Sequence, residues 1–360
     1  MPYENYLRLF GDPSSFSKGM ECITADRQLR RGIKNGTLLL EEIGNAKAVV
    51  MNKYTRKWYI ASGGWGNDDL YTIMLGAAAG DIAGQLYEHH NIKYKPELNR
   101  IIPHNSRFTD DTVMTCAVAN GIRIGLSQLP DDWMNAPEHE KVLSEAIVTS
   151  MQGFGRAYPR AGYGRRFINW LGEADPQPYN SWGNGSAMRV SYCGWVARTL
   201  EEAERLAEIS ASVTHNHPDG IAGAKAVAGS IFILKMAQDE EPFQFKPKVK
   251  DYVSKYYDLN FTLDEIRDNY SFHVSCAKSV PQAIVAFLTG KNFSDVIAEA
   301  ISIGGDSDTI AAIAGSLAEV VYPIPQGVKG RVIDRLEPML LNAIAESVDY
   351  IYNKSREKNF

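Results

Sequence analysis

Two short stretches decide how this chain folds and what it does: Thr109-Asp110-Asp111-Thr112 and Gly304-Gly305-Asp306-Ser307-Asp308-Thr309. Each places two carboxylates and a hydroxyl directly before a run of small apolar residues, a pattern typical of a helix N-terminus. Because unpaired N–H groups and the helix dipole favour acids there, a helix cap explains either stretch alone. Helix capping does not explain why the chain contains two such stretches. Together they supply the all-oxygen ligand set of hard divalent cations, which predicts a binuclear metal site.

The composition fits a compact protein with a substantial core. The chain has 360 residues, 44% of them hydrophobic, enough for one large domain or two smaller ones. The net charge of -5 and the lack of a long basic run argue against direct nucleic-acid binding. Four scattered cysteines (Cys22, Cys116, Cys193 and Cys276) form no CxxC pair, which favours a reduced, cytoplasmic compartment. We expect neither a signal peptide nor a membrane span.

Residues 1–69 differ in texture from the rest of the chain. Asn35-Gly36 stands between apolar flanks and predicts a β-hairpin. The segments 49–51 and 58–60 are typical of two further strands, and the glycine-rich residues 62–69 of a linker. We therefore expect a small N-terminal extension with β-hairpin content over residues 1–69, followed by a second domain over residues 70–360.

From residue 70 onward the apolar residues recur at helical spacing. In the first predicted helix, over 70–88, small residues such as Gly80 and Gly84 would let a neighbouring helix approach closely. Asp81 and Glu88 are seven residues apart and would share one face of it. Residues 238–272 are expected to be an insertion with one short helix. Further helices are predicted over 112–125, 138–151, 187–200, 201–212, 220–236, 280–288, 293–303, 309–321 and 329–352.

Two glycine-rich segments have the composition of ligand loops. Residues 181–189, Ser-Trp-Gly-Asn-Gly-Ser-Ala-Met-Arg, form a turn that runs into a helix and could expose N–H groups to phosphate oxygens. Residues 156–166 add arginines, glycines and tyrosines, as expected around a dinucleotide-like ligand. An ordinary surface loop is the alternative in both cases. His215 and His217 lack the further His or Cys ligands that zinc requires, so a ligand hydrogen bond or a helix-start turn is favoured.

In order and spacing these motifs resemble the ADP-ribosylglycohydrolase family, which includes dinitrogenase-reductase-activating glycohydrolase. The resemblance covers roughly residues 70–350. It implies a compact all-α domain with a centre of two divalent cations, with Mg²⁺ favoured over Mn²⁺. The matching motifs are Gly80-Asp81, Tyr87-Glu88, Thr109-Asp110-Asp111-Thr112, Gly183-Asn184-Gly185-Ser186-Ala187-Met188-Arg189, Thr214-His215 and Gly304-Gly305-Asp306-Ser307-Asp308-Thr309.

The resemblance also implies roles for individual residues. The catalytic residues would be Glu88, Asp110, Asp111 and Asp308. The chain departs mildly from the family at Ser186, where many members have glycine. The metal ligands would be Thr109, Asp110, Asp111, Asp306, Asp308 and Thr309. The ADP-ribose contacts would be Gly162, Gly164, Ser181, Gly183, Asn184, Gly185 and His215.

The implied activity is hydrolysis of the N-glycosidic bond between ADP-ribose and a modified protein side chain, with arginine as the favoured acceptor. Two alternatives stay open. One is a catalytically silent scaffold, although clustered carboxylates without a metal would repel one another and cost stability. The other is a metallohydrolase that acts on another ADP-ribose derivative.

The extension over residues 1–69 has no counterpart in the family core. Family members in bacteria can act as immunity proteins that reverse or block an ADP-ribosylating toxin, and an appended arm would suit the blocking role. We therefore treat an ADP-ribosyltransferase toxin as a candidate partner of the extension. The alternative is an arm that folds back on its own helical domain.

Overall fold

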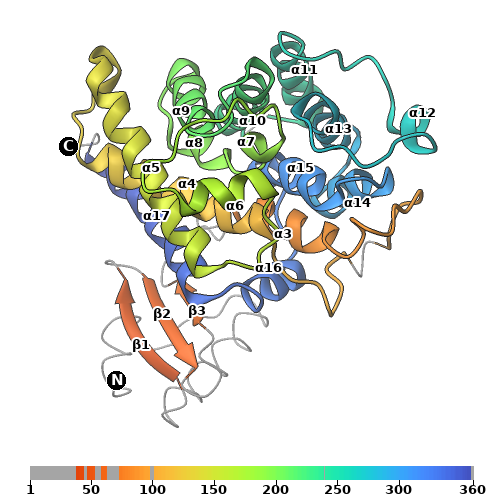
Figure 1. Cartoon of the computed structure of the whole chain (residues 1–360). Coiled ribbons are helices and arrows are strands. Elements are labelled where there is room, and N and C mark those ends of the chain that lie inside the picture. The colour runs from red at the N-terminus through yellow and green to blue at the C-terminus, as the bar shows by residue number, and fades with distance from the viewer. Residues whose placement is uncertain are drawn as a thin grey trace.

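The computed structural model describes residues 38–43, 47–52, 58–62, 73–97, 101–238 and 240–357. From residue 73 onward the described chain is helical, which confirms the predicted all-α domain (Figure 1). The helices are α3 (Leu75–Gly84), α4 (Asp110–Ser127), α5 (Pro137–Ala157), α6 (Arg165–Gly172), α7 (Gly185–Met188), α8 (Ser191–Val196), α9 (Leu200–Ser212), α10 (Pro218–Met236), α11 (Pro242–Val253), α12 (Leu263–Arg267), α13 (Cys276–Thr289), α14 (Phe293–Ser302), α15 (Ser307–Val321), α16 (Gln326–Ile333) and α17 (Pro338–Glu357), with a 3₁₀ turn, η4, at Trp133–Asn135.

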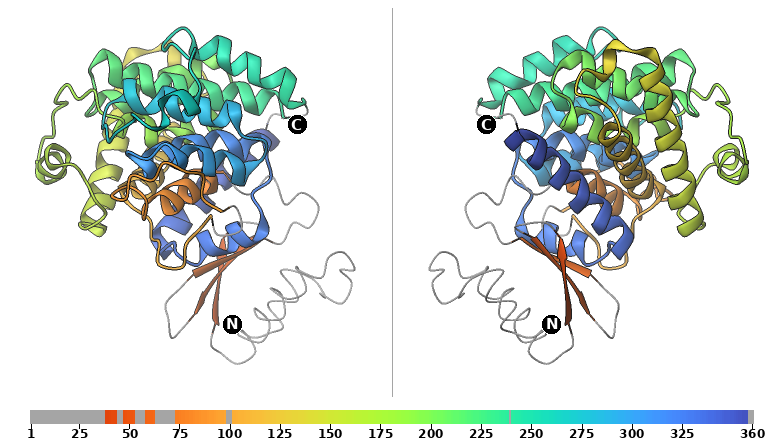
Figure 2. Two further views of the ribbon diagram at one scale, coloured as in Figure 1. Left: turned by 90° about the vertical axis from the view of Figure 1, so that its right-hand side faces the viewer. Right: turned by 90° about the vertical axis from the view of Figure 1, so that its left-hand side faces the viewer.

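Three strands precede the helices and form one antiparallel sheet in the order β1 (Leu38–Ile43), β2 (Lys47–Asn52) and β3 (Trp58–Ser62). The strands predicted over 49–51 and 58–60 are confirmed as parts of β2 and β3. The sheet lies at one end of the helical body, beside α16 and α17 (Figure 2). The predicted turn at Asn35-Gly36 and the linker beyond Ser62 lie outside the described residues.

Helices α3 and α15 pack with their backbones in contact. A Cβ atom at Gly80 would lie 1.9 Å from the carbonyl oxygen of Ala311, and one at Gly84 would lie 2.3 Å from that of Ser307. No side chain larger than hydrogen fits in this interface. The predicted close helix approach is therefore confirmed, and it holds α3 against the N-terminus of α15, where the second acidic stretch lies.

Several predicted helix boundaries were wrong. The helix predicted over 187–200 is two helices, because the backbone leaves helical geometry at Arg189, between α7 and α8. The helix predicted over 329–352 is also two, since Pro338 starts α17 anew. The segment 238–272 contains two helices, α11 and α12, where one was expected.

The first helix and the arginine-rich segment also differ from their predictions. Helix α3 ends at Gly84, so Glu88 lies in the following turns and shares no helix face with Asp81. Residues 165–172, part of which was interpreted as a candidate ligand loop, form α6, whose Phe167 and Trp170 are buried. The arginines and glycines of this stretch obscured its amphipathic pattern.

The three described cysteines are buried and unpaired by disulfides. Within the described part of the chain, no helix is long and apolar enough to cross a membrane.

Candidate active site

The first acidic stretch begins α4 and is fixed by Asp81, a fully buried residue of α3. The Asp81 carboxylate accepts hydrogen bonds from the backbone N–H of Thr109 at 2.9 Å and of Thr112 at 3.1 Å. It also accepts the hydroxyl protons of both threonines. The two backbone bonds satisfy N–H groups that a helix N-terminus leaves open, and the two hydroxyl bonds fix the flanking threonines, so Asp81 sets where Asp110 and Asp111 lie.

The second acidic stretch begins α15 and follows a tight glycine turn. Gly304 and Gly305 have φ angles of 69° and 74°, in the left-handed region that glycine enters without strain. The side-chain oxygen of Asn91 accepts the Gly305 N–H at 3.0 Å. Asp306 therefore lies at the N-cap of α15, and Asp308 in its first turn.

The structure brings the two stretches together. The hydroxyl of Thr309 donates to Oδ2 of Asp111 at 3.2 Å, a contact between residues 198 positions apart. Carboxylate oxygens of Glu88, Asp306 and Asp308 lie within 4.8 Å of one another. Glu88, from the turn after α3, thus forms one cluster with six residues of the two stretches. We call this cluster the acidic centre; its other members are Thr109, Asp110, Asp111, Asp306, Asp308 and Thr309.

Burial disfavours the charged form of these acids. Desolvation, followed by the nearby Asp81, raises the pKa of Asp110 to about 7 and that of Asp111 well above its usual range. Burial and the charge of Asp111 likewise raise the pKa of Asp308. Among the described residues no Lys or Arg pairs with these three aspartates, and Oδ1 of Asp111 is buried without a hydrogen-bond partner.

The acidic centre therefore fits divalent cations. It offers only oxygen donors, carries several negative charges in one place, and leaves a buried carboxylate oxygen unsatisfied. Hard cations such as Mg²⁺ and Mn²⁺ select this donor set, and a cation would offset the repulsion among the carboxylates.

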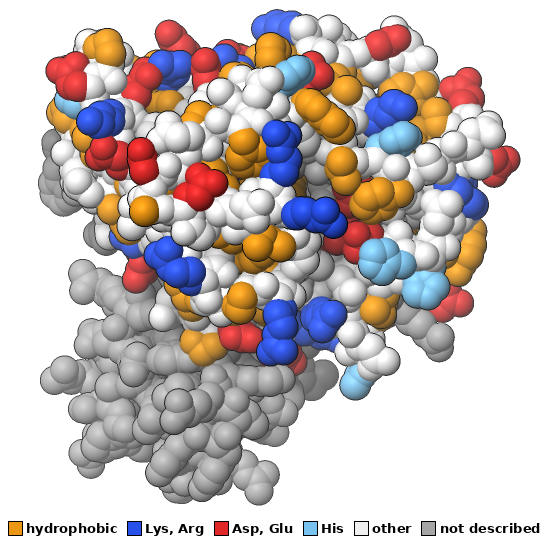
Figure 3. Space-filling view, viewed as in Figure 1, with side chains coloured by type: hydrophobic (Ala, Val, Ile, Leu, Met, Phe, Trp, Pro, Cys, Tyr) orange, Lys and Arg blue, Asp and Glu red, His pale blue; other side chains and the backbone are white. Residues whose placement is uncertain are grey.

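A cavity of about 520 Å³ opens beside the acidic centre. Figure 3 shows Asp or Glu side chains in a hollow on this face, with Lys or Arg on one side and His on the other. Of the predicted site residues, only Thr109 is absent from the cavity wall; its hydroxyl faces Asp81. The predicted residues that line the cavity are Glu88, Asp110, Asp111, Gly162, Gly164, Ser181, Gly183, Asn184, Gly185, His215, Asp306, Asp308 and Thr309.

The glycine-rich loop is joined to the acidic centre by Asn184. Its side-chain N–H groups donate to Oδ2 of Asp306 at 2.7 Å and to the hydroxyl of Ser279 at 2.9 Å. Gly183 pairs with Ser275 as an isolated antiparallel bridge, which anchors the loop on the other side. The loop that was predicted to bind a ligand is therefore held in a fixed position next to the carboxylates.

His215 lies under the glycine-rich loop as a neutral ring. Its Nδ1 is 2.6 Å from the hydroxyl of Thr214, and burial lowers its pKa well below the usual value. A Cβ at Gly185 would lie 3.1 Å from Nε2 of His215. Because the ring touches the loop this closely, a side chain at Gly185 would displace one or the other.

Three arginines that line the cavity were not among the predicted site residues. Arg165 and Arg166, exposed at the start of α6, line the cavity, and the guanidinium of Arg166 lies 5.4 Å from the ring centroid of Tyr179. Arg189 is buried, where it donates to Ser210 O at 2.9 Å. None of the three arginines has an ion-pair partner among the described residues. The four arginines in residues 156–166 indicated a positively charged segment near the ligand. They did not indicate which of these arginines line the cavity.

His217 has the role of a helix-start residue. Its Nδ1 accepts the backbone N–H of Asp219 at 3.1 Å at the beginning of α10. Among the described residues, the only candidate metal group of His, Cys and acid side chains contains no histidine.

The fold resembles a known architecture. A solved structure described as an ADP-ribosylglycohydrolase-related protein complex aligns with a TM-score of 0.55 and 20% identity, covering 80% of this chain and 98% of that one. At this level of identity the match shows the fold: a multi-helix domain of the ADP-ribosylglycohydrolase type.

The sequence comparisons define the family. The family profile described as ADP-ribosylglycohydrolase matches residues 67–358, so the chain belongs to the ADP-ribosylglycohydrolase family. ADP-ribosylhydrolase ARH3 of Mus musculus is 23% identical over 70% of this chain and 83% of its own length. ADP-ribosylarginine hydrolase Tri1 of Pseudomonas putida is 26% identical over 45% of this chain and 44% of its own length. An uncharacterized protein of Archaeoglobus fulgidus is 35% identical over 37% of this chain and 47% of its own length.

The recognised family and the enzyme class, a glycohydrolase acting on ADP-ribose, are thereby confirmed.

Proposed function

We propose that this protein is a divalent-metal-dependent hydrolase that releases ADP-ribose from a modified protein side chain, with arginine as the favoured acceptor. The observation that carries the proposal is the contact between Thr309 and Asp111, which joins the two acidic stretches at the wall of one cavity. Membership of the family supports hydrolysis of a glycosidic bond to ADP-ribose. The activity named for the Pseudomonas putida relative favours arginine.

The acidic centre would hold two cations, with Mg²⁺ favoured. When bound, a divalent cation lowers the pKa of a coordinated water and can hold ribose hydroxyls. The proposed ligands are Thr109, Asp110, Asp111, Asp306, Asp308 and Thr309.

The cavity wall contains both the acidic centre and arginines, and these opposite charges would orient the substrate. The acidic centre is suited to the ribose next to the scissile bond. The diphosphate would lie toward Arg165 and Arg166, with the N–H of Gly185 facing its oxygens, while the N–H of Gly183 donates to the Ser181 hydroxyl. Neutral His215 would contribute hydrogen bonding without adding charge, and Gly162, Gly164, Ser181 and Asn184 would complete the wall.

Cleavage of the glycosidic bond develops positive charge on the sugar ring, which nearby carboxylates stabilise. Asp110, Asp111, Asp308 and Glu88 lie where that charge would form. Glu88 is the most accessible of them, and burial raises its pKa, so it is our candidate for assisting proton transfer to the leaving group.

The acceptor is tested by comparing three substrates: protein ADP-ribosylated on arginine, protein ADP-ribosylated on serine, and O-acetyl-ADP-ribose. We expect Mg²⁺-dependent release of intact ADP-ribose, fastest from arginine. Release of AMP or phosphate instead would identify a phosphoanhydride hydrolase, and no release from any of the three would identify a silent scaffold.

The N-terminal extension, residues 1–69, is proposed as a unit separate from the helical domain of residues 70–360. Two features support a role in contacting a partner such as an ADP-ribosylating toxin. The family match begins only at residue 67, and β1 and β3 are the edge strands of the described sheet, where another chain can add a strand.

A further inference from the structure

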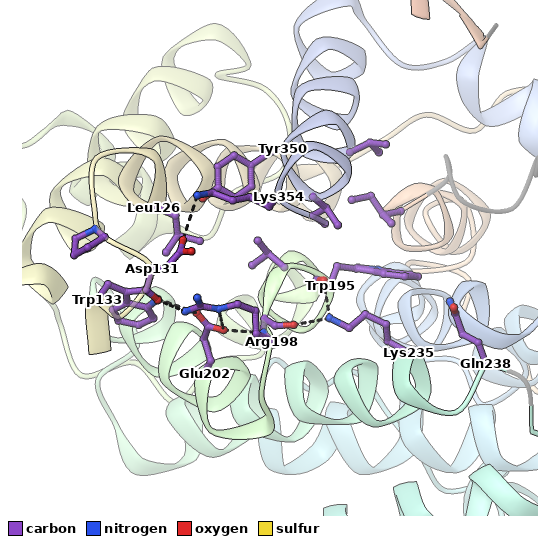
Figure 4. Close-up of a pocket in the computed structure, with 16 residues that line it drawn as sticks. Leu126, Asp131, Trp133, Trp195, Arg198, Glu202, Lys235, Gln238, Tyr350 and Lys354 are labelled. Atoms are coloured by element: carbon purple, nitrogen blue, oxygen red, sulfur yellow. Dashed lines mark hydrogen bonds and ion pairs between the residues drawn. The ribbon is translucent and has the colours of Figure 1, made fainter. Parts of the chain in front are cut away.

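A second cavity, of about 370 Å³, lies at the opposite end of α4 from the acidic centre. Leu126 lines it, about 24 Å along the helix from Asp110 at a rise of 1.5 Å per residue. The cavity is walled by helices α4, α8, α9, α10 and α17 and by η4 (Figure 4). No residue that lines the first cavity lines this one.

The wall is apolar and aromatic. Figure 4 shows Trp133 and Trp195 on opposite sides of the cavity and Tyr350 between them on the α17 side. Val196 and Ile351 also line it. Its volume falls in the range of about 300–1,000 Å³ typical of small-molecule sites, and aromatic walls favour flat ligands.

Most of the charges in this wall compensate one another. The Glu202 carboxylate accepts from Nε1 of Trp133 at 2.8 Å and from Nε of Arg198 at 3.0 Å. The Lys354 ammonium lies 3.2 Å from Oδ1 of Asp131. Two acids thus face two cations, and the hydrogen bonds hold the aromatic wall in place.

Lys235 is the remaining cation. Its ammonium donates to the carbonyl oxygen of Trp195 at 2.9 Å and to that of Ala197 at 2.5 Å. Both carbonyls lie at the C-terminal end of α8. Among the described residues no carboxylate lies within ion-pair distance of it. Its Nζ also lies 4.9 Å from the centroid of the Phe232 ring. The partners of the ammonium are therefore two carbonyls and an aromatic face, all neutral, so no described carboxylate neutralises its charge. Burial lowers the Lys235 pKa to about 8, so the ammonium form prevails at neutral pH.

We propose that this cavity binds a small aromatic monocarboxylate. The aromatic rings of the ligand would lie between the two tryptophans, and its carboxylate would accept an N–H of Lys235 in place of the weaker contact with the Phe232 ring. One negative charge matches the one cation that has no carboxylate partner, and a charge-assisted hydrogen bond of this kind is stronger than a neutral one. The site is separate from the ADP-ribose cavity and does not depend on the proposed hydrolase activity.

The probes are 2-naphthoate and its neutral analogue 2-naphthamide, titrated calorimetrically into the full-length protein at pH 7. We expect saturable binding of one naphthoate per chain, at least about tenfold tighter than the amide, which corresponds to one charge-assisted hydrogen bond. Saturating ADP-ribose should not displace it. Absence of saturable binding, equal affinity for the two probes, or displacement by ADP-ribose would overturn the proposal.

Two variants locate the site. Lys235→Met keeps the aliphatic stem and should weaken naphthoate at least about tenfold while leaving naphthamide unchanged. The matched control is Lys141→Met on α5, whose side chain is 80% exposed and which should bind both probes as the wild type does. Val196→Trp, from a half-buried position, should fill the cavity and abolish binding of both. If the thermal unfolding temperature of Lys235→Met lies well below that of the wild type, Val196→Trp becomes the deciding variant. Unchanged binding of naphthoate to folded Val196→Trp would refute the site.

Discussion

Asp81 sets the geometry of the acidic centre although it does not line the cavity. All four of its hydrogen bonds go to Thr109 and Thr112, the residues on either side of Asp110 and Asp111. Substitution of side chains that orient metal ligands typically lowers metal affinity by about 10–100-fold.

Asp81→Asn should therefore lower Mn²⁺ affinity by about 10–100-fold, because the amide can accept fewer of the four bonds and turns an N–H toward donors. Titration calorimetry measures the change, and circular dichroism checks that the helices are retained. The control is Asp175→Asn, at an exposed position. Wild-type Mn²⁺ affinity in Asp81→Asn would show that α4 holds its carboxylates without this residue.

At the residue scale, motif order and spacing allowed the candidate residues around the cavity to be named. They could not place Glu88, because the point where α3 ends depends on how the following turn packs against the Gly304-Gly305 turn. Nor could they single out Arg166, whose position over Tyr179 results from two segments that meet only in the folded chain.

Helices α3 and α15 form the contact on which the acidic centre is built. The close packing of the two helices can be tested by comparing an alanine substitution at Gly80 with one at a helical glycine that has open space beside it. That control is Gly153 of α5, where a Cβ atom would have no neighbour within 4 Å.

Gly80→Ala should destabilise the protein by about 1–3 kcal/mol or more, because its methyl group overlaps the Ala311 carbonyl. Gly153→Ala should stabilise it by about 0.4–1 kcal/mol by restricting the unfolded chain. Urea unfolding measures both. Equal effects of the two substitutions would contradict the close packing of α3 on α15.

Glu319 of α15 also fastens α3, and it makes stability depend on pH. Its buried carboxylate accepts the N–H groups of Met74 at 2.9 Å and Gly76 at 2.7 Å, and burial raises its pKa to about 8. A raised acid pKa means that the folded state binds more protons than the unfolded state between pH 4.5 and about 8. The Glu319 contribution is therefore complete below pH 4.5 and is lost as the pH rises through about 8.

Glu319→Gln should flatten this dependence: between pH 5 and pH 8 its free energy of unfolding should fall less than that of the wild type. Urea unfolding at several pH values measures the two slopes. Parallel slopes would show that Glu319 does not titrate in this window.

At the element scale, helical periodicity correctly predicted most of the long helices. Helical periodicity failed where a helix is interrupted but the apolar residues keep their spacing. An example is Arg189, a buried cation between α7 and α8. It also failed at α6, because exposed arginines dominate its composition.

At the scale of the whole molecule, the family match and the acidic centre lie in the helical domain. Deleting residues 1–60 should leave hydrolysis of the best substrate within about twofold of the full chain, since every residue that lines the cavity lies at Glu88 or beyond and substitutions away from a site rarely have large effects. Steady-state kinetics on both proteins measure this. If the shortened protein also binds an ADP-ribosylating toxin as the full chain does, the proposed partner role of the extension is refuted.

The central claim is that the two acidic stretches form one metal-dependent hydrolytic site. Its most direct test is release of ADP-ribose from ADP-ribosyl-arginine by the wild type, Asp110→Ala and Asp308→Ala, each with Mg²⁺ and with EDTA. The variants should stay folded, since each loses a carboxylate whose charge burial disfavours. We predict Mg²⁺-dependent release by the wild type alone; undiminished release by either variant, or release in EDTA, would contradict the account.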